Sequence, residues 1–319
     1  MSTRKMILDL DTGIDDSMAL TYAVGDPAID LIGVVASYGN IEAERAAVNT
    51  LKILDLLGAS SVPVFIGETH PLSEDYVRMQ VSADIHGENG IGDVTLPDPS
   101  GAVQDQNGVD FMIESAQKYG NDLTIVPTGP LTNLAKAIKQ APKAMAKVGN
   151  VTLMGGALTV PGNVTPVAEA NINQDAISAN EVFTSNLNIN MVGLDVTLRT
   201  LLTKKETQQW RDSGTTAGKK MADIVDFYIN IYADMYPELG GCSLHDPLAV
   251  GVAVDPSFVK FIDMNMVVTT KPDAYYARTI GDKNRLDDPN TNVKVAVAVN
   301  SKRYLKEFMK NMNNAFATM

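Results

Sequence analysis

The chain has 319 residues, of which 45% are hydrophobic, so it can form a large globular core and is far from the composition of a disordered protein. Its formal net charge of −12 disfavours nucleic acid and membranes as partners, because both present negative charge. A single cysteine excludes an internal disulfide and indicates a reducing compartment. The sequence has no apolar stretch suited to a signal peptide or a membrane span, so we expect a cytoplasmic protein.

Short apolar stretches alternate with helical patterns over the first two thirds of the chain. After a first strand at Met6 to Leu8, strands are predicted at residues 31–36, 62–66, 123–126, 151–154 and 189–194. Helices are predicted between them, at residues 16–24, 42–57, 110–119, 131–140 and 175–184. This alternation is typical of βαβ units and a parallel sheet.

The last third of the chain follows a different pattern. Thr203 and Glu206 form a capping box that begins a helix through Trp210, and helical spacing predicts further helices over residues 217–236 and from residue 301 onward. Strands are predicted at residues 258–270, 275–280 and 293–299. We therefore predict an α/β fold, a single domain over residues 1–319. Its open, mostly parallel, Rossmann-like sheet is flanked by helices, with a small antiparallel extension near the C-terminus.

Four aspartates surround the end of the first strand: Asp9, Asp11, Asp15 and Asp16. Gly13 lies between the two pairs, where the chain can turn before a helix begins. Such carboxylates would repel each other unless they took up protons or bound a cation, and an all-oxygen set favours Ca²⁺ or Mg²⁺ over zinc. Helix capping is the simpler explanation of such aspartates, but capping requires neither Asp9 nor Asp11.

Oxygen and amide side chains also follow later strands. Ligands bind at the carboxyl ends of the strands of an open parallel sheet, so these residues are candidates for one site. No phosphate-binding glycine motif is present. A long irregular segment, residues 67–106, carries His86 in a glycine-rich loop and is either functional or a surface turn. One face of a predicted helix carries Tyr228, Tyr232 and Tyr236. These side chains either pack against the core or contact a planar ligand.

Together these residues resemble the inosine–uridine-preferring nucleoside hydrolases, which are calcium-dependent N-ribohydrolases. The matching motifs, in chain order, are DLDTGIDD at residues 9–16, Gly39-Asn40, His86-Gly87, TGPLTN at residues 128–133, Met154-Gly155-Gly156, Asn163 with Glu169 and Asn171, and His245-Asp246-Pro247. Two positions depart from the family pattern: Thr12 replaces a usual proline, and Ala170 stands where an aromatic residue is often found beside the ribose.

The resemblance implies an enzyme that hydrolyses the N-glycosidic bond of nucleosides to free base and ribose. Ca²⁺ would be held by the carboxylates of Asp11, Asp16 and Asp246 and by the carbonyl of Thr128, and Asp11 would activate a Ca²⁺-bound water. His245 would lie near the leaving base as a catalytic acid or base-binding group, while Asp9 would support the cluster from behind. The expected substrate-binding residues are Asp15, Asn40, His86, Asn163, Glu169, Asn171 and Tyr232. Homodimers or homotetramers are common in the family.

Two other functions are compatible with parts of the sequence. Asp9-Leu10-Asp11-Thr12 also resembles the opening motif of haloacid-dehalogenase-like phosphatases, in which Asp9 would be the nucleophile and Mg²⁺ the metal. That function leaves Asp15, Asp16 and the His245-Asp246 pair without roles. A non-catalytic nucleoside- or sugar-binding protein would keep the same pocket, but binding alone does not need a base beside the metal.

Overall fold

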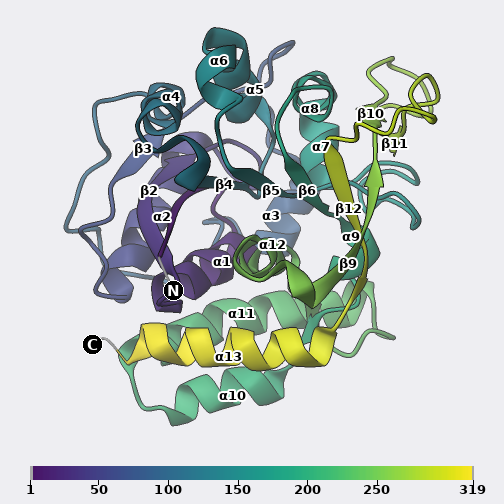
Figure 1. Ribbon diagram of the computed structural model, residues 1–319. Coiled ribbons are helices and arrows are strands. Elements are labelled where there is room, and N and C mark those ends of the chain that lie inside the picture. The colour runs from purple at the N-terminus through teal and green to yellow at the C-terminus, as the bar shows by residue number, and fades with distance from the viewer. Residues whose placement is uncertain (1–2, 318–319) are drawn as a thin grey trace.

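An eight-stranded sheet forms the centre of the molecule, with the strand order β3-β2-β1-β4-β5-β6-β12-β9 (Figure 1). The computed structural model describes residues 3–317. Neighbouring strands pair in parallel except β9, which runs antiparallel to β12. The bounds are β1 Arg4–Leu10, β2 Ile29–Ala36, β3 Val64–Ile66, β4 Leu123–Pro127, β5 Asn150–Met154, β6 Ile189–Val192, β9 Val259–Met264 and β12 Val293–Val299. The predicted α/β fold with a mostly parallel sheet is confirmed.

The middle of strand β1, Met6 to Leu8, is entirely apolar, and the packing of the sheet explains why. Met6, Leu8 and Leu10 pack into the core on one face of the sheet, while Ile7 packs into the core on the other face. Successive side chains of a strand point to opposite faces, so a strand that is covered on both faces needs apolar residues at every position. The central place of β1, between β2 and β4, puts the aspartates that follow it near the middle of the sheet edge.

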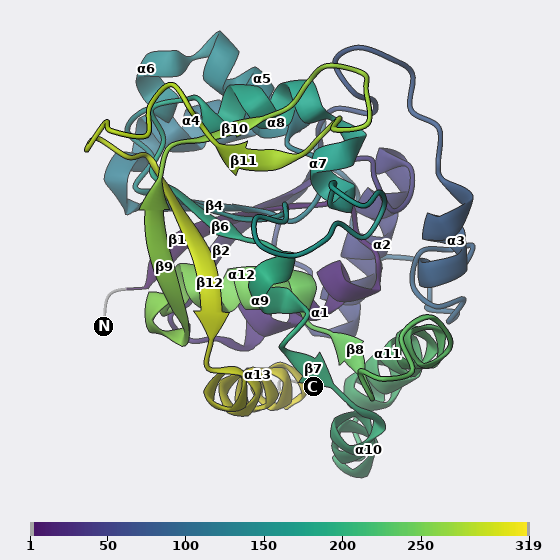
Figure 2. The same cartoon turned by 90° about the vertical axis from the view of Figure 1, so that its right-hand side faces the viewer.

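Helices cover both faces of the sheet (Figures 1 and 2). One face carries α4 Gly108–Tyr119, α5 Thr132–Gln140, α6 Pro142–Met145 and α8 Ala176–Phe183. The other face carries α1 Ile14–Gly25, α2 Ala43–Leu56 and α12 His245–Val254. Outside this second layer lie α10 Lys204–Asp212, α11 Thr216–Met235 and α13 Ser301–Phe316. Within the described residues, no helix is both long enough and apolar enough to cross a membrane.

Several element boundaries differ from the predictions. The strand predicted at residues 258–270 is divided into β9 and β10 (Met266–Val268), because Asn265 between them donates to the carbonyls of Arg285 and Asp288. β10 pairs with β11 (Thr279–Gly281), which is shorter than the predicted strand, in a separate antiparallel sheet. β6 ends at Val192 rather than residue 194, because the backbone N–H of Leu194 donates to Gly156 in the loop after β5.

Short elements that the sequence did not reveal lie around the carboxyl ends of the strands. They are α3 Gln80–His86 within the long irregular segment, α7 Ala170–Gln174, α9 Leu194–Thr197 after β6, and the two-residue strands β7 Leu201–Leu202 and β8 Cys242–Ser243. Two 3₁₀ turns, η1 Gly120–Asp122 and η2 Pro256–Phe258, complete the structure. Elements this short have too few residues to show a hydrophobic period.

Candidate active site

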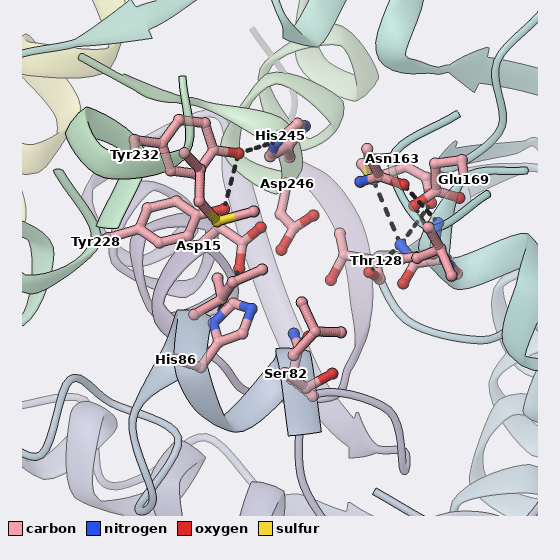
Figure 3. A pocket seen from close by; sticks show the side chains of 18 of the residues that line it. Asp15, Ser82, His86, Thr128, Asn163, Glu169, Tyr228, Tyr232, His245 and Asp246 are labelled. Carbon is pink, nitrogen blue, oxygen red and sulfur yellow. Dashed lines mark hydrogen bonds and ion pairs between the residues drawn. The ribbon is translucent and has the colours of Figure 1, made fainter. Parts of the chain in front are cut away.

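Three buried carboxylates from two helix N-termini meet beyond the end of β1 (Figure 3). Asp15 and Asp16 lie in the first turn of α1, and Asp246 lies in the first turn of α12. Each of these side chains has one oxygen within 4.8 Å of those of the other two. The fold therefore brings the early aspartates and the late His245-Asp246 pair to one place.

Asp11 follows β1 directly and is held by the backbone around it. Its Oδ2 accepts a hydrogen bond of 2.7 Å from the backbone N–H of Asn40. Glycines make this close packing possible: a β-carbon at Gly39 would overlap Asp11 Oδ2, and one at Gly129 would lie 3.1 Å from Asp11 Oδ1. Among the described residues, Oδ1 of Asp11 and Oδ1 of Asp15 are buried without a hydrogen-bond partner. Because such atoms are costly to bury, they point to a bound ligand.

The carboxylates of the cluster all have raised pKa values in the protein alone. Burial, together with the charge of Asp16, raises the pKa of Asp15 to about 8 and that of Asp11 well above its usual range. Burial and the neighbouring aspartates also raise the pKa of Asp246 well above that range, and burial raises the pKa of Asp16. A bound cation would reverse these shifts, since it favours the ionised form of each group.

The donor set fits a hard divalent cation. Every side chain of the cluster offers oxygen, two of the carboxylate oxygens have no other partner, and no cysteine or histidine belongs to the set. Thr128 lines the same pocket, and its hydroxyl donates to Asp16 Oδ1 at 2.8 Å. The cluster can therefore hold a metal ion.

Amide side chains fix the groups around the cluster. Asn171 Nδ2 donates to the carbonyl of Thr128 at 2.7 Å, and Asn40 Nδ2 donates to Asp16 Oδ2 at 3.2 Å. Behind the cluster, Asp9 is fully buried and accepts a hydrogen bond from Asn133 Nδ2 at 2.8 Å. Asp9 is not among the residues that line the pocket.

One wall of the pocket comes from the loop after β5. Glu169 caps α7, accepting hydrogen bonds from the backbone N–H groups of Asn171, Ile172 and Gly156. Asn163 Oδ1 accepts from the backbone N–H of Ala170 at 3.0 Å. Glu169, Asn163 and Asn171 all line the pocket. In Figure 3, Asn163 and Glu169 lie on the side opposite Tyr228 and Tyr232. This wall presents carboxylate and amide groups, which suit hydroxyl-bearing ligands.

The opposite wall is aromatic. The tyrosines at 228, 232 and 236 on α11 all line the pocket, so the stripe is not only a packing feature. Tyr232 Oη lies 2.7 Å from His245 Nε2 and 3.3 Å from Tyr228 Oη. His245 Nδ1 lies 2.8 Å from the hydroxyl of Thr197. Burial lowers the pKa of His245 to about 4, so this histidine is neutral near pH 7.

His86 belongs to the pocket rather than to a surface turn. It ends α3, is 5% exposed, and lies with its ring stacked on Tyr228 at a centroid distance of 5.6 Å. Its Nδ1 accepts a hydrogen bond from the backbone N–H of Ile14, so any hydrogen on the neutral ring is on Nε2. Burial, assisted by Arg78 and His245, lowers the pKa of His86 to about 3.

The structure adds lining residues that the sequence analysis did not identify: Val81, Ser82 and Ile85 from α3, Met154, Val164, Leu198 and Met235. It also adds two residues of α9, Asp195 and Thr197, that hold the walls in place. Both residues follow the end of β6. They could therefore have been identified from the rule that ligands bind at the carboxyl ends of parallel strands.

The two walls suit the two halves of a single type of ligand. Carboxylates and amides near a cation site match vicinal hydroxyls of a sugar, and stacked aromatic rings match a planar base. The fold and the site together therefore define the class of hydrolases that act on nucleosides.

Comparison with known proteins gives the family. The family model described as inosine-uridine preferring nucleoside hydrolase matches residues 6–306, and the chain belongs to this family. It is 32% identical over 315 residues to the probable uridine nucleosidase 2 of Arabidopsis thaliana, covering 97% of each chain. It is 33% identical over 302 residues to the pyrimidine-specific ribonucleoside hydrolase RihB of Escherichia coli (strain SE11), covering 94% of each.

Solved structures agree with this assignment. The purine-preferring ribonucleoside hydrolase from Gardnerella vaginalis is similar with a TM-score of 0.97 and 50% sequence identity, over 99% of this chain and 100% of that chain. The protein is a nucleoside hydrolase, an N-glycosidase that converts nucleosides to free base and ribose. The phosphatase alternative is not supported, and its expected nucleophile, Asp9, lies behind the pocket.

Proposed function

We propose that the cation is Ca²⁺ and that Asp11, Asp16, Asp246 and the Thr128 carbonyl hold it. The observation that carries this proposal is a pair of buried carboxylate oxygens without a hydrogen-bond partner. One belongs to Asp15, in the cluster of Asp15, Asp16 and Asp246, and the other to Asp11, whose pKa is raised by burial and by the charges of Asp16 and Asp15. Asp15 is also close enough to be a ligand. It lines the pocket, as Asp246 and Thr128 also do, and we assign it to the substrate because the family resemblance implies that role.

We infer that Asp15, Asn40, Asn163, Glu169 and Asn171 bind the ribose hydroxyls. When bound, the cation would supply positive charge that orients vicinal hydroxyls and makes water more acidic. Asp11, fixed between Gly39 and Gly129, accepts the proton of the attacking water, whose oxygen bonds to C1′. The electrons of the broken C1′–N bond leave with the base, which takes up a proton. Nearby carboxylates stabilise the positive charge that develops on the sugar.

At the other wall, His86, Tyr232 and His245 contact the base. The short contact between Tyr232 Oη and His245 Nε2 places a hydrogen-bond donor where negative charge develops on the leaving base. We propose that purine nucleosides are preferred, because three tyrosines and the apolar side chains of Val81, Ile85 and Met235 favour stacking on a large ring system. The 50% identity to a hydrolase described as purine-preferring supports this preference.

We further propose that the chain is a single domain, residues 1–319, which the family match over residues 6–306 supports. The family resemblance also supports a homodimer or homotetramer. Light scattering on a size-exclusion column measures the assembly directly, and a monomer at working concentration would reject it.

One assay tests the function as a whole. The purified protein is incubated with inosine, guanosine, adenosine, uridine and cytidine, and free base and reducing sugar are measured separately after chelation and after addition of Ca²⁺ or Mg²⁺. We expect equal amounts of base and sugar, no turnover after chelation, and recovery with Ca²⁺. Full activity in the chelated protein would reject the metal site, and faster cleavage of uridine than of inosine would reject the purine preference.

A further inference from the structure

Thr197 makes an unusual contact at the edge of the site. It is the last residue of α9 and is fully buried. Its hydroxyl lies 2.8 Å from Nδ1 of His245, and within residues 3–317 this is the only hydrogen bond that its side chain makes. Thr197 does not line the pocket, so it reaches the substrate only through His245.

Several other buried threonines use their hydroxyls locally. Thr21 in α1 and Thr50 in α2, and also Thr200 just after α9, each donate to the backbone carbonyl four residues earlier, which is the ordinary local partner in a helix. For Thr197 that carbonyl belongs to Gly193, and it accepts the backbone N–H groups of Val196 and Thr197 but not the Thr197 hydroxyl. The hydroxyl of Thr197 is thus free of its local partner and directed to His245.

The single partner decides the direction of this hydrogen bond. A buried hydroxyl hydrogen without an acceptor is costly, and the only acceptor available to Thr197 is Nδ1 of His245. When Nδ1 accepts, the hydrogen of the neutral ring is on Nε2, which donates to Tyr232 Oη at 2.7 Å. Tyr232 then directs its own hydrogen away from His245, toward Tyr228 Oη or into the pocket.

We propose that Thr197 is a positioning residue for departure of the base: it holds Nδ1 of His245 as an acceptor and thereby directs the Tyr232 hydroxyl hydrogen at the leaving group. This proposal rests on the proposed base-contacting role of His245 and Tyr232. As the C1′–N bond breaks, negative charge develops on the base, and a donor that is already oriented stabilises it. The hydrogen bonds from His245 Nε2 to Tyr232 and from Tyr232 to the base become stronger during this step. His245 keeps its hydrogen on Nε2.

Substrates with different leaving groups separate this role from a structural one. The variants are Thr197→Val, which keeps the shape and removes the hydroxyl, and Thr197→Ser, which keeps the hydroxyl. Thr200→Val is the matched control, because it removes a buried hydroxyl near α9 that bonds only to Val196. Each is assayed with the best nucleoside substrate and with 4-nitrophenyl β-D-ribofuranoside, whose leaving group departs as a stable anion without help.

For Thr197→Val we expect kcat on the nucleoside to fall roughly 10- to 100-fold, less than the roughly 10²–10³-fold for loss of a direct donor. KM should change little, and kcat on the nitrophenyl riboside should stay near wild type. Thr197→Ser should recover most of the nucleoside activity, and Thr200→Val should behave as wild type on both substrates.

Other results overturn the proposal. If Thr197→Val lowers kcat equally on both substrates, or if Thr197→Ser does not restore activity on the nucleoside, Thr197 only supports the structure. If kcat on the nucleoside is unchanged in Thr197→Val, the hydroxyl of Thr197 has no role. Thermal melting reports whether each variant folds, and if the valine variant does not fold, Thr197→Ala replaces it under the same criteria. Failure of the proposed function is distinguishable, because the wild-type protein would then release neither base nor sugar from any nucleoside.

Discussion

The hydroxyl of Tyr232 on α11 lies 2.7 Å from Nε2 of His245 on α12, and this contact joins the aromatic wall of the pocket to the helix that carries Asp246. Both side chains are buried, so the hydrogen bond is protected from competing water. The first turn of α12 thus carries the proposed base contact, His245, next to the proposed metal ligand, Asp246.

Replacing Tyr232 with phenylalanine removes the hydroxyl and keeps the ring. We expect kcat on nucleosides to fall roughly 10²–10³-fold, the usual effect of removing an oriented donor to a charge that develops in the reaction. Stacking of the ring is kept, so KM should change far less. Tyr304→Phe is the control, because the Tyr304 hydroxyl is buried in the core without a partner among the described residues. Steady-state kinetics that show a higher KM and an unchanged kcat would contradict the prediction.

Replacing Asp11 with asparagine should depress turnover much more than binding. The amide keeps the size of the side chain but cannot accept a proton from water, and general base catalysis contributes roughly 10²–10⁴-fold to a rate. The readouts are kcat and the dissociation constant of the substrate. Asp263→Asn, at an exposed position on β9, is the control for loss of a carboxylate. A turnover number near wild type would exclude Asp11 as the base.

The stability of the metal-free protein should fall as pH rises from about 6.5 to 8. In the folded protein the pKa of Asp9 is raised to about 7 and that of Asp15 to about 8, mainly by burial. In the unfolded chain both groups are already ionised in this window, so the folded state binds more protons and loses stability as it releases them. The two buried histidines oppose this trend only in part. They are neutral in the folded protein, while the unfolded chain, whose histidine pKa is about 6.5, releases its remaining histidine protons by about pH 7.5.

Thermal melting in the presence of a chelator and of Ca²⁺ measures this effect. The midpoint should decrease with pH in chelator, while saturating Ca²⁺ should raise it and make the dependence flatter, because the cation stabilises the ionised carboxylates. A metal-free midpoint that increased over this window would show that the raised carboxyl pKa values are wrong.

Asp195 should act on substrate binding through the loop after β5. Its carboxylate accepts hydrogen bonds from the backbone N–H groups of Leu158 and Thr159 and from the Thr159 hydroxyl. Asp195→Ala leaves these donors unpaired, at roughly 1–3 kcal/mol of stability for each buried group. We expect a lower melting temperature and a raised KM, because this loop carries Asn163 and Glu169. Thr159→Val removes only one donor and should show the same changes to a smaller extent. Unchanged KM in both variants would contradict the prediction.

Much of the fold and half of the site follow from local sequence patterns. The alternation of apolar strands with amphipathic helices predicted the parallel sheet, and the aspartates at residues 9–16 predicted a cation site, because one strand, one turn and one helix start bring them together. The sequence left the long irregular segment open between a functional loop and a surface turn, and its helix α3 brings His86 to the pocket.

The sequence alone determined most of the strands and long helices, though not α12, and that carboxylates gather at the end of the first strand, because these properties depend on neighbours a few residues apart. Only the tertiary structure decided that the tyrosines of α11 face the pocket, that Asp246 joins the early aspartates, and that Thr197 and Asp195 hold the two walls. A helical period shows that residues share a face, but what covers that face is decided by the packing of segments far apart in the chain.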